Sequence, residues 1–345
     1  MGLMDRLKKT TAIEYASVLE DSELFDDCQV VPTEIPILNV ALSGDLKGGL
    51  TSGVTQIAGP SKHFKSLLAL ILVRAFLNQY KDGVILFYDS EFGMPRPYFK
   101  TLGIDMNRVF HVPLVDIEEL KQDLMAQLKE SKRGDHLMVV IDSMGMLASA
   151  KEVDDTLEKK QVADMTRAKS IKSLFRMVTP RFKIKDIPLV VVNHIYMEQG
   201  MYPKAIVSGG TGSYLASDNL WVIGRQQEKV KDVVAGWNFI INVEKSRFVK
   251  EKSKLIITVM NEGGVETYSG LLDIATEGGF IEKVSPGWYL PKGSKTKLQE
   301  KDMMTGEFWD SYLTNEAFNE CIRKRFKVSY GSLMESDGGS SEAAS

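Results

Sequence analysis

The sequence predicts an α/β protein in which a mostly parallel sheet is flanked by helices. Four short apolar runs, at residues 54–58, 84–88, 137–141 and 188–192, end in polar residues or glycine and precede longer stretches with helical spacing. This alternation is typical of a parallel sheet with ligand sites at the carboxyl ends of its strands. The composition agrees, because 43% hydrophobic and 26% charged residues are usual for a globular protein and exclude a disordered or fibrous chain.

The length and charge of the chain limit its organisation and its partners. Its 345 residues correspond to two domains, or to one large α/β domain with appendages. The net charge is only −3, so any contact with nucleic acid must come from a local basic surface. Cys28 and Cys321 lack paired or zinc-type spacing and are expected to be buried thiols in a reducing cytosol. The longest apolar run, residues 67–73, is too short to span a membrane, and we expect no secretion signal.

Changes in pattern divide the chain into four parts. The boundaries are residues 1–30, 31–270, 271–330 and 331–345. The first part is predicted to be one short helix followed by a linker, and the second holds the parallel core. The third is interpreted as a small, separately packed α/β region, and the Ser- and Gly-rich fourth part as a disordered acidic tail. Strand patterns at 220–223, 239–243 and 255–260 predict an antiparallel addition to the core.

The strongest local motif is a loop between a predicted strand and a predicted helix at residues 67–77. Its residues are Gly59, Pro60, Ser61, Lys62, His63, Phe64, Lys65 and Ser66. It nearly matches a Walker A loop, whose backbone N–H groups cradle phosphates while Lys65 reaches the β and γ phosphates and Ser66 binds Mg²⁺. Phe64 departs from that pattern, in which glycine is usual, so the motif alone leaves a plain strand-turn-helix as an alternative.

Three of the predicted strands are followed by polar side chains at one edge of the sheet. Asp142 ends one strand, as does the Walker B carboxylate that holds the water shell of Mg²⁺. Asp89 and Glu91 end another, and either could deprotonate the water that attacks the γ-phosphate, a role worth about 10²- to 10⁴-fold in rate. His194 follows a third, where a polar group can report whether the nucleotide is intact. Singly, these residues also fit capping carboxylates and a hydrogen-bonded histidine.

The order of these parts resembles the RecA/Rad recombinases over about residues 1–330. The resemblance lies in residues 35–44, 59–66, 87–93, 163–169 and 243–247. In a phage group of this family the phenylalanine at position 64 is part of the pattern. The resemblance implies a RecA-like P-loop ATPase core, an N-terminal oligomerisation segment, and ATP and Mg²⁺ as cofactors. It makes Glu91 the general base, Asp142 the Walker B acid and His194 the nucleotide sensor.

The resemblance also assigns roles to residues outside these strand ends. Tyr98 falls where the family stacks an aromatic ring on adenine, with a core position on a helix as the alternative. Lys245 and Arg247 match a pair that reaches from one subunit into the neighbour's ATP site. Cations there stabilise charge on the transferring phosphoryl group and can be worth about 10³- to 10⁵-fold. Without the family, the same pair is interpreted as a solvated basic edge.

By the same resemblance, two loops on the carboxyl side of the sheet bind DNA, at about residues 152–166 and 196–212. A long loop in a compact domain is either functional or disordered. The glycines of the second loop can bring backbone N–H groups to phosphates, and its Met and Tyr side chains can stack on bases. The candidate contacts are Lys159, Lys160, Arg167, Met197, Met201, Tyr202, Ser208, Gly209 and Gly210. The charges of the first loop also fit ordinary helix surface.

The sequence therefore predicts a DNA-dependent ATPase that forms helical filaments on single-stranded DNA and pairs it with a homologous duplex. The expected processes are recombination, repair and recombination-dependent replication. Mediator and single-strand-binding proteins are the expected further partners, with no membrane, and the expected location is the cytoplasm of an infected bacterial host. Two alternatives stay open: a ring-forming helicase motor, and a non-catalytic DNA-coating protein for which ATP is only a conformational ligand.

Overall fold

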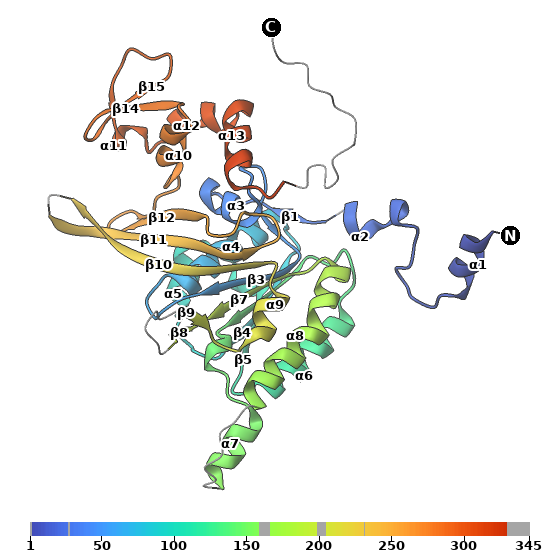
Figure 1. Ribbon diagram of the computed structural model, residues 1–345. Coiled ribbons are helices and arrows are strands. Elements are labelled where there is room, and N and C mark those ends of the chain that lie inside the picture. The colour runs from blue at the N-terminus through green and yellow to red at the C-terminus, as the bar shows by residue number, and fades with distance from the viewer. Residues whose placement is uncertain (1, 27, 159–165, 199–204, 231, 330–345) are drawn as a thin grey trace.

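A nine-stranded sheet forms the centre of the computed structural model, which describes residues 2–26, 28–158, 166–198, 205–230 and 232–329 (Figure 1). The strand order is β13-β12-β11-β10-β3-β7-β6-β4-β5. The strands are β3 (Gly53–Ala58), β4 (Val84–Asp89), β5 (Val109–Pro113), β6 (Leu137–Asp142), β7 (Pro188–Asn193), β10 (Asn219–Val230), β11 (Val233–Ser246), β12 (Lys254–Met260) and β13 (Gly264–Val265).

The direction of the strands confirms the predicted fold class. Strands β5, β4, β6, β7, β3 and β10 pair in parallel, whereas β11, β12 and β13 continue the sheet in antiparallel fashion. The four predicted core strands match β3, β4, β6 and β7 to within a residue at each end. The parallel arrangement brings the carboxyl ends of these four strands to one edge, where the polar residues of the candidate site lie.

Helices cover both faces of the sheet. On one face lie α3 (Pro36–Ser43) and α4 (Lys65–Gln79), and on the other lie α6 (Ile117–Glu130) and α8 (Thr166–Lys185). Side chains alternate between the two hydrophobic clusters along each central strand: in β4, Phe87 belongs to the first and Tyr88 to the second. Burial on both faces explains why these strands are continuous apolar runs in the sequence.

The N-terminal residues contain the expected short helix, α1 (Leu3–Thr10), which Figure 1 shows standing away from the sheet. None of its residues is buried, and Leu3 and Leu7 are 64% and 56% exposed. A turn of 3-10 helix (Leu19–Asp21) and α2 (Glu23–Asp26) follow it. Strands β1 (Val30–Val31) and β2 (Leu50–Thr51) form a separate two-stranded sheet beside the core.

The C-terminal region combines a three-stranded sheet with four short helices. The elements are α10 (Leu271–Glu277), β14 (Ile281–Ser285), β15 (Trp288–Pro291), β16 (Leu298–Gln299), α11 (Glu300–Met303), α12 (Gly306–Leu313) and α13 (Glu316–Phe326). The region contacts the core, because Leu271 and Trp309 belong to the same hydrophobic cluster as side chains of α3 and α4. In addition, Oδ2 of Asp45, which follows α3, lies 3.4 Å from Nη1 of Arg323 and 3.7 Å from Nζ of Lys327.

Two further expectations concern the burial of the cysteines and the absence of a membrane-spanning segment. Cys28 is exposed and Cys321 is partly exposed, so the prediction of two buried thiols is wrong for Cys28. Cys28 lies in the polar stretch before β1, which leaves the sulfur open to solvent. Among the described residues, no helix combines the length and the apolar character that crossing a membrane requires.

Candidate nucleotide-binding site

The phosphate loop joins the carboxyl end of β3 to the first turn of α4. Lys62 and Phe64 adopt left-handed backbone conformations, with φ of 61° and 62°, which cost about 1–2 kcal/mol in a residue with a Cβ. The ring of Phe64 stacks on Phe239 of β11, with centroids 4.8 Å apart and planes 20° apart. Arg225 of β10 donates from Nη1 to the Lys62 carbonyl (3.4 Å) and stacks on Trp237, 3.3 Å from its ring centroid. The β10–β11 hairpin therefore braces the loop.

The Lys65 ammonium lies inside this loop. The residue is only 6% exposed, and its Nζ donates to the Pro60 carbonyl at 2.7 Å. Burial lowers the pKa of Lys65, and the charges of Glu91 and Asp142 act in the opposite direction. A buried cation with one carbonyl partner, close to two carboxylates, is suited to bind phosphate oxygens. Earlier in the loop, Nδ1 of His63 lies 2.8 Å from the backbone oxygen of Ser61.

Asp142, at the end of β6, is the most deeply buried acid of this edge. It is 4% exposed, and burial raises its pKa to about 6 although a hydrogen bond with Ser66 acts to lower it. Within the described residues its Oδ1 is buried without a hydrogen-bond partner. An orphaned carboxylate oxygen beside a hydroxyl fits Mg²⁺, which takes one or two protein oxygens together with phosphate oxygens and waters.

Hydrogen bonding distinguishes the two carboxylates at the carboxyl end of β4, Asp89 and Glu91. Asp89 Oδ1 accepts from the backbone N–H groups of Glu91 (3.1 Å) and Phe92 (2.7 Å), and its Oδ2 lies 3.1 Å from Nε2 of His111. Asp89 therefore holds the bend after the strand and is only 6% exposed. Glu91 is the carboxylate that faces the site, so the geometry favours it over Asp89 as the general base.

Glu91 is tied to the ends of two neighbouring strands. Its Oε1 lies 2.5 Å from Nε2 of His194, which follows β7, and accepts a hydrogen bond from the hydroxyl of Ser143, which follows β6. The hydrogen bond from His194 is the largest of the effects that hold the pKa of Glu91 below its usual value. Glu91 is therefore ionised near neutral pH, as a base must be before it accepts a proton.

Tyr98 lies on α5 (Arg96–Thr101), the helix that follows the Glu91 bend. It is 45% exposed, so the alternative of a core position on a helix does not apply. The assignment of Tyr98 to adenine stays a prediction.

Lys245 and Arg247 lie at the carboxyl end of β11, which β10 separates from β3 and the phosphate loop. Lys245 pairs with Leu220, which pairs with Gln56, the fourth of the six residues of β3. The Lys245 ammonium donates to the carbonyls of Tyr214 (2.8 Å) and Leu215 (3.0 Å). These carbonyls belong to α9 (Thr211–Ala216), so protein oxygens of its own chain hold the ammonium.

Arg247 forms an ion pair with Asp218, the residue that precedes β10. Its Nε lies 2.8 Å from Asp218 Oδ1, and Asp218 Oδ2 accepts from the backbone N–H of Val54 (2.9 Å). Val54 and Ala58 are four residues apart on β3, a rise of about 13 Å. The Arg247 guanidinium, held by Asp218 at the Val54 end of β3, therefore lies far from the phosphate loop of its own chain.

The described part of the second predicted DNA loop holds two short paired strands, the first of which follows His194. Strand β8 (Ile195–Met197) pairs with β9 (Ala205–Val207), and Met197 is 57% exposed. After β9, Gly209 and Gly210 have φ of 98° and 71°, a backbone conformation that glycine takes without strain. Met201 and Tyr202 lie outside the described residues.

The first DNA loop is partly helical. Helix α7 (Ala150–Leu157) occupies residues expected to be loop, because Ser149 caps it by accepting from the backbone N–H of Glu152 (3.1 Å). Lys159 and Lys160 lie outside the described residues. Arg167, at the start of α8, bonds to protein carbonyls and to Ser208 rather than projecting into solvent. That Lys159, Lys160 or Arg167 contacts DNA stays a prediction.

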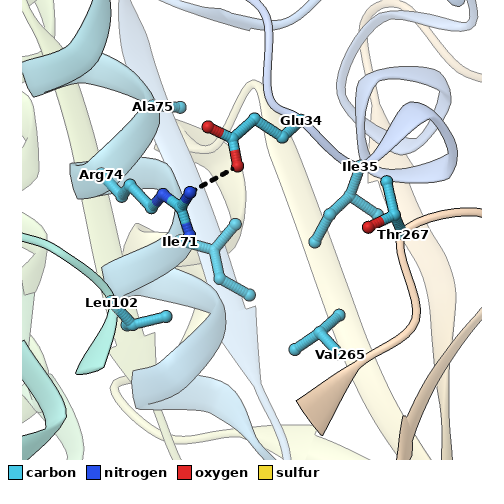
Figure 2. Close-up of a pocket in the computed structure, with 8 residues that line it drawn as sticks. All are labelled: Glu34, Ile35, Ile71, Arg74, Ala75, Leu102, Val265 and Thr267. Atoms are coloured by element: carbon cyan, nitrogen blue, oxygen red, sulfur yellow. Dashed lines mark ion pairs between the residues drawn. The ribbon is translucent and has the colours of Figure 1, made fainter. Parts of the chain in front are cut away.

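A small pocket lies beside α4, away from the phosphate loop (Figure 2). It has a volume of about 100 Å³, and an ion pair of 2.7 Å joins Arg74 to Glu34 at its rim. Ile71 and Val265 contribute to its apolar walls. Ile71 is six residues beyond Lys65, about 9 Å along the helix, so this pocket is not part of the phosphate site.

A phosphate loop and two strand-end carboxylates at the carboxyl edge of a parallel sheet define a P-loop nucleotide-binding protein. Comparison with known families specifies the class further. The model of the RecA N-terminal domain matches residues 6–266, and that of "Bacteriophage T4, Recombination and repair protein, C-terminal domain" matches residues 268–322. The chain belongs to the RecA family, which confirms the resemblance and the RecA-like core.

Individual relatives agree with the family models. The chain is 43% identical over 336 residues to the recombination and repair protein (UvsX) of Enterobacteria phage T4, covering 94% of this chain and 86% of the relative. It is 26% identical over 283 residues to Protein RecA of Francisella philomiragia, covering 80% and 75%. Protein RecA of Paracoccus denitrificans is 26% identical over 246 residues, covering 70% and 67%.

Sequence reasoning missed two residues that shape this site. Ser143 directly follows Asp142, so its place at a strand end was a usable signal. Phe239 is far from Phe64 along the chain, and the only signal was the unusual phenylalanine in the loop, whose left-handed backbone calls for a compensating contact.

Proposed function

We propose that this chain is a strand-exchange recombinase that hydrolyses ATP in a filament on single-stranded DNA. The observation that carries the proposal is the contact between Glu91, the candidate base, and His194 at the root of the β8–β9 hairpin. It links the nucleotide site directly to a segment that the family uses on DNA. The names of the relatives, which refer to recombination and repair, support the same function.

Binding of the triphosphate is assigned to the loop of residues 59–66. Its backbone N–H groups, the N-terminus of α4 and the Lys65 ammonium would hold the phosphates. Ser66 and Asp142 would hold Mg²⁺, which when bound supplies positive charge to the β and γ phosphate oxygens. The buried Oδ1 of Asp142 would then gain the partner that it lacks among the described residues.

We assign to Glu91 the role of general base, which accepts the proton from the attacking water. Both side-chain hydrogen bonds of its carboxylate, from His194 and Ser143, use Oε1, so Oε2 is the oxygen that accepts the proton. The two bonds fix the carboxylate plane, which orients the water for in-line attack. Loss of the γ-phosphate would change the environment of the Glu91–His194 pair, and the hairpin that begins at Ile195 would respond.

Assembly completes the site in this proposal. Within one chain Tyr214, Leu215 and Asp218 hold Lys245 and Arg247, and a head-to-tail neighbour would present the two cations to the phosphate loop. A head-to-tail contact that does not close into a ring generates a helical filament. The exposed helix α1 would pack on the adjacent protomer and secure this contact.

The same proposal covers the partners and the location. Single-stranded DNA would lie along the filament and be paired with a homologous duplex. Because backbone phosphates would dominate, affinity should fall steeply with salt and depend little on sequence. Mediator and single-strand-binding proteins would assist loading, and the cytoplasm of an infected bacterial host would be the site of action.

ATP hydrolysis with and without single-stranded DNA, followed by electron microscopy of the mixture, tests the proposed function. DNA-stimulated turnover together with helical filaments is the expected result. Closed rings without filaments would instead indicate a helicase motor. Filaments that need ATP but never hydrolyse it would indicate a non-catalytic DNA-coating protein.

A further inference from the structure

Arg167 is held by the backbone segment that follows the Asp142 strand. The residue is the second of α8, and its guanidinium donates three hydrogen bonds to the turn after β6. Nε donates to the carbonyl of Leu147 (2.8 Å), and Nη2 donates to those of Met144 (3.1 Å) and Gly145 (2.9 Å). This turn leads into α7 and the first predicted DNA loop, so Arg167 fixes the root of that loop.

The fourth hydrogen bond of Arg167 goes to the root of the second predicted DNA loop. Its Nη1 donates to the hydroxyl of Ser208 (3.2 Å), which directly follows β9. Ser208 is in turn tied to the end of β7: its N–H donates to the His194 carbonyl (2.9 Å), and Asn193 Nδ2 donates to the Ser208 carbonyl (2.8 Å). One guanidinium thus joins two loop roots that lie far apart in the sequence.

These contacts close a ring at the candidate base. Ser143, next to Met144, and His194, bonded to Ser208, both bind Oε1 of Glu91. Gly145 packs so tightly on the histidine that a Cβ on this glycine would lie 2.6 Å from Cδ2 of His194. A shift of His194 would therefore displace the turn that Arg167 holds, and with it both loop roots.

We propose that Arg167 is a positioning residue that transmits the state of the Glu91–His194 pair to both DNA loops, rather than a contact to DNA phosphate. The inference rests on the proposed function and adds a residue to it. All three nitrogens of the guanidinium are engaged in a fixed fork, which the single ammonium of lysine cannot reproduce. The side chain is part-buried, and its donors face protein oxygens.

The test compares Arg167→Ala with Lys169→Ala, which removes an exposed cation two residues further along the same helix. Two quantities are measured for each full-length variant: the ratio of ATP hydrolysis with and without single-stranded DNA, and the slope of log affinity against log salt. We expect Arg167→Ala to lower the stimulation ratio by about tenfold, within the usual range of coupling between sites. Its hydrolysis without DNA should stay within about twofold of the unsubstituted protein, and its salt slope should not change.

A direct phosphate contact gives a different result. Loss of one such contact makes the slope for single strands shallower by about 0.7, and the stimulation ratio at saturating DNA is then retained. Either a shallower slope or a retained ratio in Arg167→Ala overturns the inference. Lys169→Ala should keep the full ratio, and a loss equal to that of Arg167→Ala would also overturn it.

Ser208→Ala keeps the test decisive if Arg167→Ala does not fold. It removes one of the four hydrogen bonds of Arg167 and leaves the three to backbone carbonyls in place. We expect a smaller drop in the stimulation ratio, in the same direction, and an unchanged ratio would contradict the inference. If DNA fails to stimulate hydrolysis by the unsubstituted protein, the proposed function fails. If DNA stimulates the unsubstituted protein and the variants equally, only the role of Arg167 fails.

Discussion

Two carboxylates two positions apart, Asp89 and Glu91, are separated by their hydrogen bonds. One carboxylate oxygen of Asp89 accepts hydrogen bonds from the backbone of the following bend, and the other contacts His111. Glu91 has one oxygen held by His194 and Ser143 and the other assigned to water. Sequence could place both residues at a strand end, but it could not distinguish them, because the decision depends on which N–H groups the bend presents.

Glu91→Gln should abolish turnover and leave ATP-dependent DNA binding intact. The amide keeps the size of the side chain but cannot accept a proton from water, so we expect a loss of about 10²- to 10⁴-fold in the single-turnover rate. Glu130→Gln, an exposed glutamate at the end of α6, is the matched control. Unchanged turnover in Glu91→Gln would move the base to another residue.

His194→Ala should move the acid limb of the pH profile of hydrolysis to higher pH. The hydrogen bond from His194 lowers the pKa of Glu91, whereas burial acts to raise it. Without the imidazole, Glu91 protonates at a higher pH and the base is lost earlier as the solution is acidified. His194→Asn, which retains a donor, should move the limb less. An unmoved limb in His194→Ala would show that the histidine does not control the base.

At the scale of elements, strands with continuous apolar sequence can be predicted, whereas strands that mix apolar and polar residues cannot. Strands β3, β4, β6 and β7 are buried on both faces and were located from the sequence. Edge strand β5 was missed, because its residues are partly exposed and include His111 and a proline.

The hairpin and the non-local contacts of the site show the same limit. Strands β10 and β11 were predicted too short, because their outer halves carry polar residues such as Arg225 and Asn238. The strand-end residues of the site were predictable from local spacing. The Phe64–Phe239 stack and the bonds of Arg167 were not, because they join segments that only folding brings together.

Phe239→Ala should weaken ATP binding by about 2- to 10-fold, the worth of an aromatic pair. The stack with Phe64 supports a left-handed residue in the phosphate loop, so its loss should affect nucleotide affinity more than the turnover rate at saturating ATP. Phe110→Ala, which removes an exposed ring of β5, is the control for equilibrium binding of an ATP analogue.

Adding Phe64→Gly to Phe239→Ala should recover part of the affinity. Glycine adopts the left-handed conformation without the steric cost that phenylalanine has. If Phe239→Ala alone binds nucleotide normally, the hairpin does not brace the loop.

At the scale of the whole molecule, the two proposed parts of the reactive site lie on different strands of the sheet. The phosphate loop, Asp142 and Glu91 lie at the carboxyl edge, while Asp218 holds Arg247 at the amino end of β3 and Lys245 lies level with Gln56. A molecule with complementary halves at its two ends builds head-to-tail polymers. Helix α1, with no buried residue, is the further part that a neighbour would cover.

Mixing two inactive variants tests this completion in trans most directly. Lys65→Ala cannot hold the triphosphate but carries both cations, and the double variant Lys245→Ala, Arg247→Ala holds the triphosphate without supplying cations. In an equal mixture on single-stranded DNA, random assembly should restore about a quarter of the unsubstituted ATP hydrolysis, because one in four head-to-tail contacts has both halves intact. Hydrolysis that stays at the level of the separate variants, in filaments shown to contain both, would contradict a nucleotide site shared between neighbouring protomers.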